Sequence, residues 1–199
     1  MEFADILRRR RMTRRYRPDP VPADVIRRIV AVVHRAPSAG FSQGHRIVVI
    51  TDPARRARLA AIAEPWYLRH GHHPWISQAP VQLALGIREA AYHERYQEPD
   101  KVQDGGAEIP WPVPFWWFDA GALLVLLQLA AADEGLASGF YSPAAPDELG
   151  ALAEVAELPD GTMLTGVMTL GYPSDDSAAR TGRLSSRRKP IDELVTWLG

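Results

Sequence analysis

The sequence predicts one α+β domain spanning residues 1–199, in which helices flank a largely buried sheet. Three observations lead to this fold class. Short apolar runs rich in β-branched residues are typical of buried strands, and apolar residues with helical spacing recur between them. Apolar residues make up 46% of the 199 residues, which is enough for a substantial core. The sequence contains no internal repeat and no linker that would divide it.

The first half of the chain predicts helices alternating with strands. A short helix at 2–11 ends in arginines, which suit the negative end of its dipole. The prolines at 17–22 predict a turn or an extended connector. We expect the other elements of this half to be a helix at 23–35, a strand at 46–51, a helix at 53–63, an irregular segment at 64–79 and a strand at 81–87.

The second half opens with an irregular, aromatic-rich insertion at about 92–117, a feature typical of lids and binding loops. Asp119 then predicts the cap of a helix that reaches about Glu134. This helix is apolar nearly all round, so we expect it to be central and buried. The remaining elements are expected to be a strand at 138–141, a helix at 146–157, a strand at 163–171 and a helix starting at Pro190.

Composition excludes several classes of protein. The formal net charge of −1 argues against a dedicated nucleic-acid-binding protein. The chain has no cysteine, which excludes disulfides, thiolate catalysis and cysteine metal sites, so redox chemistry would need a bound cofactor. No signal peptide is visible, and the apolar stretch from Ala120 to Ala132 is interrupted by Gln128 and too short to cross a bilayer. We therefore expect a cytoplasmic protein that does not contact a membrane.

The positive charge is concentrated near the N-terminus. Seven arginines lie between Arg8 and Arg17, whereas the whole chain has only two lysines. Arginine is suited to bidentate recognition of phosphate. The same run is also compatible with a solvated helix end or with a nucleic-acid-binding arm, and composition does not separate these three interpretations.

Two other patterns carry less weight. Gly40-Phe41-Ser42-Gln43-Gly44 fits the G-x-S-x-G motif of serine hydrolases, but that motif needs a strand before it and a helix after it. Here the predicted order is reversed, and no histidine follows His93. The histidines at 70–73 lie in a loop beside Gly71, which favours a solvated or substrate-facing loop over a metal site. We expect no bound metal.

Several segments together have a recognisable order: Arg10-Arg11-Met12-Thr13-Arg14-Arg15-Tyr16 with Pro20-Val21-Pro22, Ala36-Pro37-Ser38-Ala39-Gly40-Phe41-Ser42-Gln43-Gly44, Gln78-Ala79-Pro80-Val81, Asp119-Ala120-Gly121-Ala122, Gly135-Leu136-Ala137-Ser138-Gly139, Gly171-Tyr172-Pro173 and Arg188-Lys189-Pro190-Ile191. In this order they resemble the motifs of the FMN-dependent nitroreductase family, among them R-R-S-x-R-x-F…P-V, A-P-S-x-x-N-x-Q-P-W, G-Y-P and R-K-P-L. The resemblance extends over nearly the whole chain. It implies the nitroreductase-like fold, with a central, mostly antiparallel sheet, and an intertwined homodimer with the flavin at the subunit interface.

The resemblance also implies which residues bind tightly held, non-covalent FMN. The arginines would contact the ribityl phosphate, with Arg188 reaching it from the C-terminal segment. Small residues after Pro37 would let the backbone approach the isoalloxazine ring, Gln43 would bind the ring edge or the ribityl chain, and backbone N–H groups before Gly139 would face N5 and O4. The full set of implied cofactor residues is Arg10, Arg11, Met12, Arg14, Pro37, Ser38, Ala39, Gly40, Gln43, Leu136, Ala137, Ser138, Gly139 and Arg188.

Two departures from the family pattern concern the implied cofactor site. At the phosphate end, Met12 stands where the family has serine, which removes a hydroxyl donor but leaves the backbone N–H. At the ring end, Phe41 stands where the family has asparagine and Gly44-His45 replaces Pro-Trp, which changes the groups available to hydrogen-bond the edge of the flavin ring. The Trp-rich stretch admits two interpretations, which are core or dimer packing and a lid that stacks an aromatic substrate over the flavin. Under the second, Phe41, Trp116 and Trp117 would contact the substrate.

The resemblance implies a reductase of nitroaromatics, quinones or other electron-poor small molecules that takes hydride from NAD(P)H. The catalytic chemistry would be carried by the flavin and not by a side chain. Three specialised activities within the family stay open, namely a dehalogenase, a flavin-fragmenting enzyme and a deazaflavin-linked reductase. A protein that sequesters FMN without turnover is a further alternative.

Overall fold

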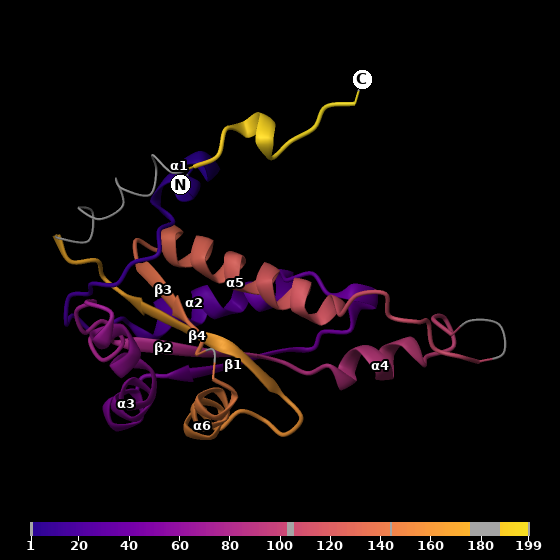
Figure 1. The fold of residues 1–199 in the computed structure, drawn as a ribbon, viewed down its shortest axis with the longest axis horizontal. Helices are drawn as coiled ribbons and strands as arrows, with labels where there is room; N and C mark the ends of the chain where they lie inside the picture. Colours follow the sequence, from indigo (N-terminus) through magenta and orange to yellow (C-terminus); the bar gives the residue numbers. More distant parts are fainter. Residues whose placement is uncertain (1, 103–105, 144, 176–187, 199) are drawn as a thin grey trace.

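The computed structural model describes residues 2–102, 106–143, 145–175 and 188–198. Its centre is a four-stranded sheet with the order β1-β2-β4-β3 (Figure 1). All three neighbouring pairs are antiparallel. The strands are β1 (His45–Ile50), β2 (Val81–Ile87), β3 (Ala137–Tyr141) and β4 (Met163–Gly171). The predicted α+β class and the antiparallel sheet are therefore confirmed.

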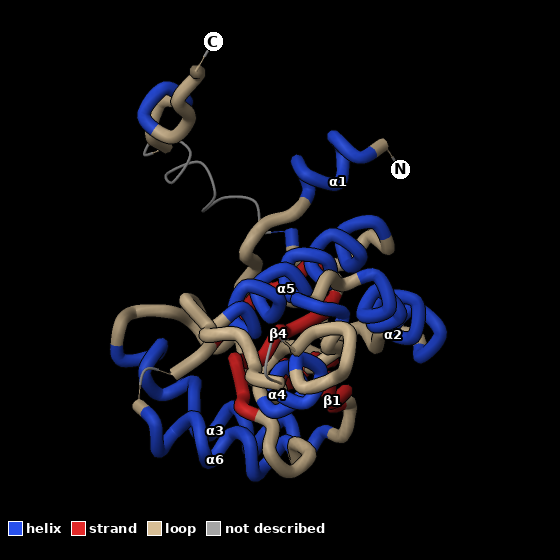
Figure 2. The backbone as a smooth tube through the Cα atoms, turned by 90° about the vertical axis from the view of Figure 1, so that its right-hand side faces the viewer, coloured by secondary structure: helices blue, strands red, loops and turns tan. Residues whose placement is uncertain are grey.

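Helices cover both faces of this sheet (Figures 1 and 2). On one face α2 and α5 enclose a core that contains Leu83, Leu85 and Met168. On the other face α3 and α6 enclose a core that contains Ala84 and Val167. The helices and 3₁₀ turns are α1 (Phe3–Arg9), α2 (Ala23–Val30), η1 (Ala31–Arg35), η2 (Ala39–Phe41), α3 (Pro53–Arg69), α4 (Ala90–Tyr96), α5 (Phe115–Asp133), α6 (Pro146–Ala156) and η4 (Ile191–Glu193).

Helix α5 is the central helix that the sequence predicts, but it begins four residues earlier than expected, at Phe115. Asp119 is therefore not its cap and lies inside the helix as a buried carboxylate. The helix extends because Trp116 packs with Tyr92 and Ile87. With 19 residues α5 is long and apolar enough to cross a membrane by composition alone. Its contacts with α2 and the sheet are those of a core helix.

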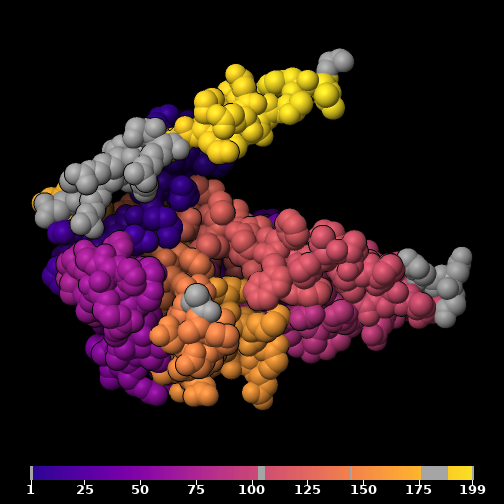
Figure 3. All heavy atoms as spheres, in the orientation of Figure 1, coloured from indigo at the N-terminus to yellow at the C-terminus, as the bar shows by residue number. Residues whose placement is uncertain are grey.

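Three local predictions are wrong. Residues 64–69 are not irregular, because α3 continues to Arg69 through an internal Pro65 and packs Tyr67 against Trp75. The start of the aromatic insertion forms α4, whose Tyr92 is buried. The expected helix after Pro190 is only the 3₁₀ turn η4. The described tail 188–198 is exposed and projects from the body of the molecule (Figure 3), so among the described residues it has little surface against which to stabilise a helix.

Candidate functional site

The segment 10–16, which we call the arginine segment, lies along the edge of β3. Met12 forms a parallel bridge with Ser138, and the Thr13 N–H donates to the Ser138 carbonyl at 2.7 Å. The Tyr16 hydroxyl donates to the Thr13 carbonyl at 2.9 Å and lies 2.7 Å from the Thr169 hydroxyl. Burial raises the pKa of Tyr16 and keeps this hydroxyl protonated. The fold thus joins two segments, 10–14 and 136–139, that the sequence assigns separately to the cofactor.

Gly139 makes this close approach possible. A Cβ atom on Gly139 would lie 2.5 Å from the Thr13 carbonyl oxygen and 2.7 Å from the Thr169 hydroxyl oxygen. It would also lie 2.8 Å from the ring of Trp75. Any larger residue would therefore push the arginine segment away from β3. The structure gives Gly139 a packing role in addition to the cofactor contact that the sequence predicts.

Gln128 of α5 supports the arginine segment from the other side. Its Oε1 accepts from Nη1 of Arg10 at 3.4 Å, and its Nε2 donates to Sδ of Met12 at 3.3 Å. The side chain is buried in a helix that is otherwise apolar at its centre. In the sequence, Gln128 stands out only as an interruption of the apolar run. That interruption is the signal that points to a polar contact at this position.

Arg14 lies over two aromatic rings, with its guanidinium carbon 5.6 Å from the centroid of Tyr67 and 5.5 Å from that of Trp75. Trp75 is fully buried, and its Nε1 has no hydrogen-bond partner among the described residues. Within the described ranges neither Arg10 nor Arg14 is paired with a carboxylate. Both therefore keep an uncompensated positive charge beside β3, as the binding of a phosphate group requires.

The loop that carries Trp75 is held by one buried carboxylate. Oε1 of Glu64 accepts from the backbone N–H groups of Trp75 and Ile76 at 2.7 Å each and from that of Ser77 at 3.1 Å. Three donors on one oxygen fix the loop against α3. This contact could not be predicted while Glu64 was expected to lie in an irregular segment, because Glu64 in fact belongs to α3.

Of the pockets near the arginine segment, two bear on a cofactor, and only the first of them is lined by residues of the segment itself. The first has a volume of about 370 Å³, and its lining includes the predicted residues Arg11, Leu136 and Ala137. The second, of about 330 Å³, is lined mainly by apolar and aromatic groups: Ala63, Trp66, Tyr67, Tyr141, Ser142, Pro143, Ala145 and Glu148. Tyr67 belongs to the second pocket and also contacts Arg14. An aromatic pocket next to a free guanidinium matches a ligand that combines a planar ring with a phosphate. The sequence did not predict this pocket.

The other predicted cofactor residues, Pro37 to Gln43, lie elsewhere in the chain. The Ala39 N–H donates to Oδ2 of Asp119 at 3.0 Å, near the start of α5. Gln128, which contacts the arginine segment, comes nine residues later on the same helix, a distance of about 14 Å along the helix axis. Within one chain the turn and the arginine segment are therefore not brought together.

The remaining predicted residues are also dispersed. Arg188 is exposed in the described tail, and no contact with Arg10 is found in the part of the chain that the structure describes. Trp116 is buried against Tyr92 and Trp111, whereas Trp117 is 44% exposed. Of these two tryptophans, Trp116 has a packing role within the chain and Trp117 remains accessible.

The hydrolase motif and the histidines have local explanations. The Ser42 hydroxyl donates to the Ala39 carbonyl at 2.6 Å, and strand β1, not a helix, follows the motif. His70 stacks on Trp66 with ring centroids 4.0 Å apart, and His72 packs edge-on against Tyr67. Among the described residues, no group of three or more histidine, aspartate or glutamate side chains is arranged to hold a metal ion.

Comparison with known proteins defines the class. Residues 7–172 match the Nitroreductase family. The chain therefore belongs to this family.

Individual relatives agree with the family match. A protein of Thermus thermophilus named NADH dehydrogenase is 28% identical over 209 residues, covering 95% of this chain and 92% of that protein. A nitroreductase family protein of Streptococcus pneumoniae superposes with a TM-score of 0.75 at 20% identity, covering 99% and 100% of the two chains. Iodotyrosine deiodinase bound to FMN and 3-iodo-L-tyrosine superposes with a TM-score of 0.66 at 17% identity, covering 87% and 91%. The two structures show the same fold, and the family match together with the Thermus relative supports an oxidoreductase.

Proposed function

We propose that this protein is an FMN-dependent oxidoreductase that reduces electron-poor small molecules, such as nitroaromatics or quinones, with hydride from NAD(P)H. The observation that carries this proposal is the joining of the arginine segment to β3. It places Arg10 and Arg14, neither paired with a carboxylate among the described residues, beside β3, and Arg14 lies over Tyr67, which lines an aromatic pocket. Bound FMN would supply the hydride chemistry that the side chains lack.

The residues of this region fit such a cofactor by their chemistry. Arg10, Arg11 and Arg14 would hold the phosphate through charge-assisted hydrogen bonds, together with the backbone N–H of Met12. Residues Leu136 to Gly139 would present backbone groups, and the pocket at Tyr141 would receive the planar ring. In this arrangement Trp75 and Gln128 position the two outer arginines and do not touch the substrate.

We further propose that the site is completed in a homodimer. The 37–43 turn and Arg188 do not reach the arginine segment of their own chain, so a second copy would supply both. Large exposed apolar side chains support this assembly. On α5 Val125 is 49% exposed, and in the tail Trp197 and Leu198 are 84% and 95% exposed. Such a surface is typical of an interface between subunits.

The visible spectrum of the purified protein tests the proposal. We expect flavin bands that bleach when NADH or NADPH is added without oxygen and that return when a quinone or nitroaromatic is supplied. Bands that persist with both reductants would favour a deazaflavin donor or sequestration of FMN. A colourless protein that cannot be reconstituted with FMN would overturn the proposal.

One second candidate is a reductive dehalogenase within the same family. It is favoured by the structural similarity to iodotyrosine deiodinase and by Phe41, which stands where the family motif has asparagine. Halide release from a halogenated phenol, measured with the chemically reduced protein, separates the two activities. Release at a rate above that of nitroaromatic or quinone reduction would favour the dehalogenase. Breakdown of the flavin itself during turnover would instead indicate a flavin-fragmenting enzyme.

A further inference from the structure

The turn at residues 38–43 has an unusual backbone. Gly40, Phe41 and Gln43 have φ angles of +61°, +62° and +51°, which lie in the left-handed region. Glycine adopts this region freely, but phenylalanine and glutamine do so rarely. Such conformations persist only where the surrounding structure fixes them, and they cluster at functional sites. The contacts that fix this turn therefore bear on function.

One fixing contact comes from α5. Oδ2 of the buried Asp119 accepts from the Ala39 N–H at 3.0 Å and from the Tyr92 hydroxyl at 2.7 Å. Burial, followed by the hydrogen bond to Asp119, raises the pKa of Tyr92, so its hydroxyl stays protonated and remains a donor. Nε2 of His45 donates to the Asp119 carbonyl at 3.2 Å. Burial lowers the pKa of this histidine, which favours its neutral form.

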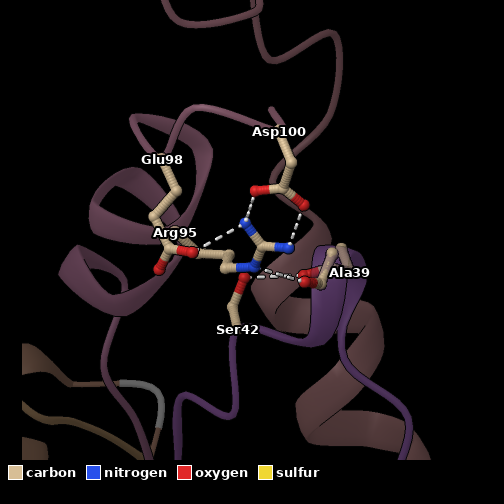
Figure 4. Close-up of polar contacts among 6 residues, drawn as sticks. Ala39, Ser42, Arg95, Glu98 and Asp100 are labelled. Atoms are coloured by element: carbon tan, nitrogen blue, oxygen red, sulfur yellow. Dashed lines mark hydrogen bonds and ion pairs between the residues drawn. The ribbon is translucent and has the colours of Figure 1, made fainter. Parts of the chain in front are cut away.

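A second fixing contact comes from α4. Nε of Arg95 donates to the Gly40 carbonyl at 2.9 Å. The other two nitrogens of the guanidinium bind both carboxylate oxygens of Asp100 at 2.7 Å, and one of them also binds Glu98 at 3.0 Å (Figure 4). The Arg95 side chain is only 20% exposed, and its planar group is held on every edge. The turn is thus braced from two helices at successive residues, Ala39 and Gly40.

What this bracing presents is Phe41. Its side chain is 71% exposed although its backbone is held in a disfavoured conformation. A rigid backbone with an exposed aromatic side chain is suited to recognition, because little conformational freedom remains to be lost when a ring stacks on it. A purely structural turn would not need an aromatic residue at the exposed left-handed position.

We propose that Asp119 and Arg95 are positioning residues that hold Phe41 against the flavin ring bound by a second copy, where Phe41 limits the size of the substrate. The inference rests on the flavin-dependent, dimeric function proposed above. Asp119 and Arg95 do not touch substrate or cofactor. They act through the position of Phe41, so their effects should depend on its presence.

A double-mutant cycle tests this dependence. The variants are Asp119→Ala, Arg95→Met and Phe41→Ala, alone and in pairs with Phe41→Ala. Arg95→Met keeps the length of the side chain but removes its hydrogen bonds. If Asp119→Ala does not fold, the Arg95→Met variants still test the inference. The control is Glu134→Ala, which removes a bidentate ion pair with Arg28 between α5 and α2, outside the turn. Asp119→Asn keeps one oxygen acceptor, so its KM ratio should lie closer to that of wild type than the ratio of Asp119→Ala does.

The measurements are flavin content, the rate of flavin reduction by NAD(P)H, and KM and kcat for quinones of increasing size. We expect each single variant to retain flavin and to change the ratio of KM values between large and small quinones at least about threefold. Each double variant should show nearly the same KM ratio as Phe41→Ala alone, because Asp119 and Arg95 act through Phe41. The control should leave this ratio unchanged.

Two outcomes would overturn the inference: fully additive effects in the cycle, or an unchanged KM ratio in variants that are as stable as the control. Both of these outcomes can be observed only if the wild-type protein binds flavin and accepts electrons from NAD(P)H. A wild-type protein without flavin would instead refute the proposed function, so the two failures can be told apart.

Discussion

Replacing Gly139 with alanine should disrupt the arginine segment from a position that does not itself carry charge. The added Cβ would lie 2.5 Å from the backbone oxygen of Thr13 and 2.7 Å from the Thr169 hydroxyl oxygen, much closer than atoms can approach. Overpacking of this kind destabilises a folded protein by about 1–3 kcal/mol. Loss of the hydrogen bond from the Thr13 N–H to Ser138 adds about 1 kcal/mol.

The expected total of about 2–4 kcal/mol corresponds to a decrease in Tm of roughly 5–15 °C for a chain of this size. It is measured by calorimetry at one protein concentration, because a dimer unfolds in a concentration-dependent way. Flavin affinity should fall at the same time, since Arg10 and Arg14 move with the segment.

A matched control is Gly150→Ala in α6, where an added Cβ would meet nothing within 4 Å. Because alanine favours a helix interior over glycine, this variant should be as stable as wild type or more stable by up to about 1 kcal/mol. If Gly139→Ala behaves like Gly150→Ala in both Tm and flavin content, the close packing of the arginine segment on β3 is not what holds the site.

Three further results are expected. Arg10→Ala combined with Arg188→Ala should weaken FMN binding at least about 100-fold in a fluorescence titration, because each removes a charge-assisted hydrogen bond to phosphate; unchanged affinity would show that the phosphate lies elsewhere. Gln128→Leu should retain stability but weaken FMN binding about fivefold, since a buried acceptor for Arg10 is lost; a drop in Tm with normal affinity would contradict this. Hydrogen bonding to Glu108 is the largest cause that raises the pKa of His93, so its stabilising contribution is present below pH 6.5 and is lost as pH rises through the raised pKa. The His93 ring contacts the rings of Trp111 and Trp116, with centroids 5.8 Å apart in each pair. The tryptophan fluorescence of wild type, but not of His93→Gln, should therefore change above pH 6.5.

Local sequence patterns were sufficient for most of the fold. The strands at 81–87 and 163–171 are where their apolar runs predict them, because both faces of the sheet are buried. The tail after Pro190 illustrates the limit, since its apolar spacing predicts a helix but its apolar side chains are exposed and bury nothing against the other described residues.

The candidate site was predictable only where a motif marks it. The arginines and residues 136–139 follow from the family resemblance, and the structure joins them. The contacts of Tyr67 and Trp75 with Arg14 could not be predicted, because they link a helix end and a loop to a segment that lies 53 and 61 residues earlier in the chain. Arg95 was missed for a related reason: it acts on a backbone carbonyl, and such contacts leave no pattern in the sequence.

The separation of the 37–43 turn from the arginine segment along α5 has a genetic consequence. If each flavin lies between the arginines of one chain and the turn of another, a defect in either element can be complemented by the other chain. A dimer formed from an Arg10→Ala chain and a Phe41→Ala chain would have one doubly defective site and one intact site. When the two impaired proteins are unfolded, mixed and refolded, about a quarter of all sites should therefore be of wild-type composition. These sites would combine the FMN affinity that the Arg10→Ala chain lacks with the discrimination between large and small quinones that the Phe41→Ala chain lacks, whereas a site contained within a single chain would recover no such combination.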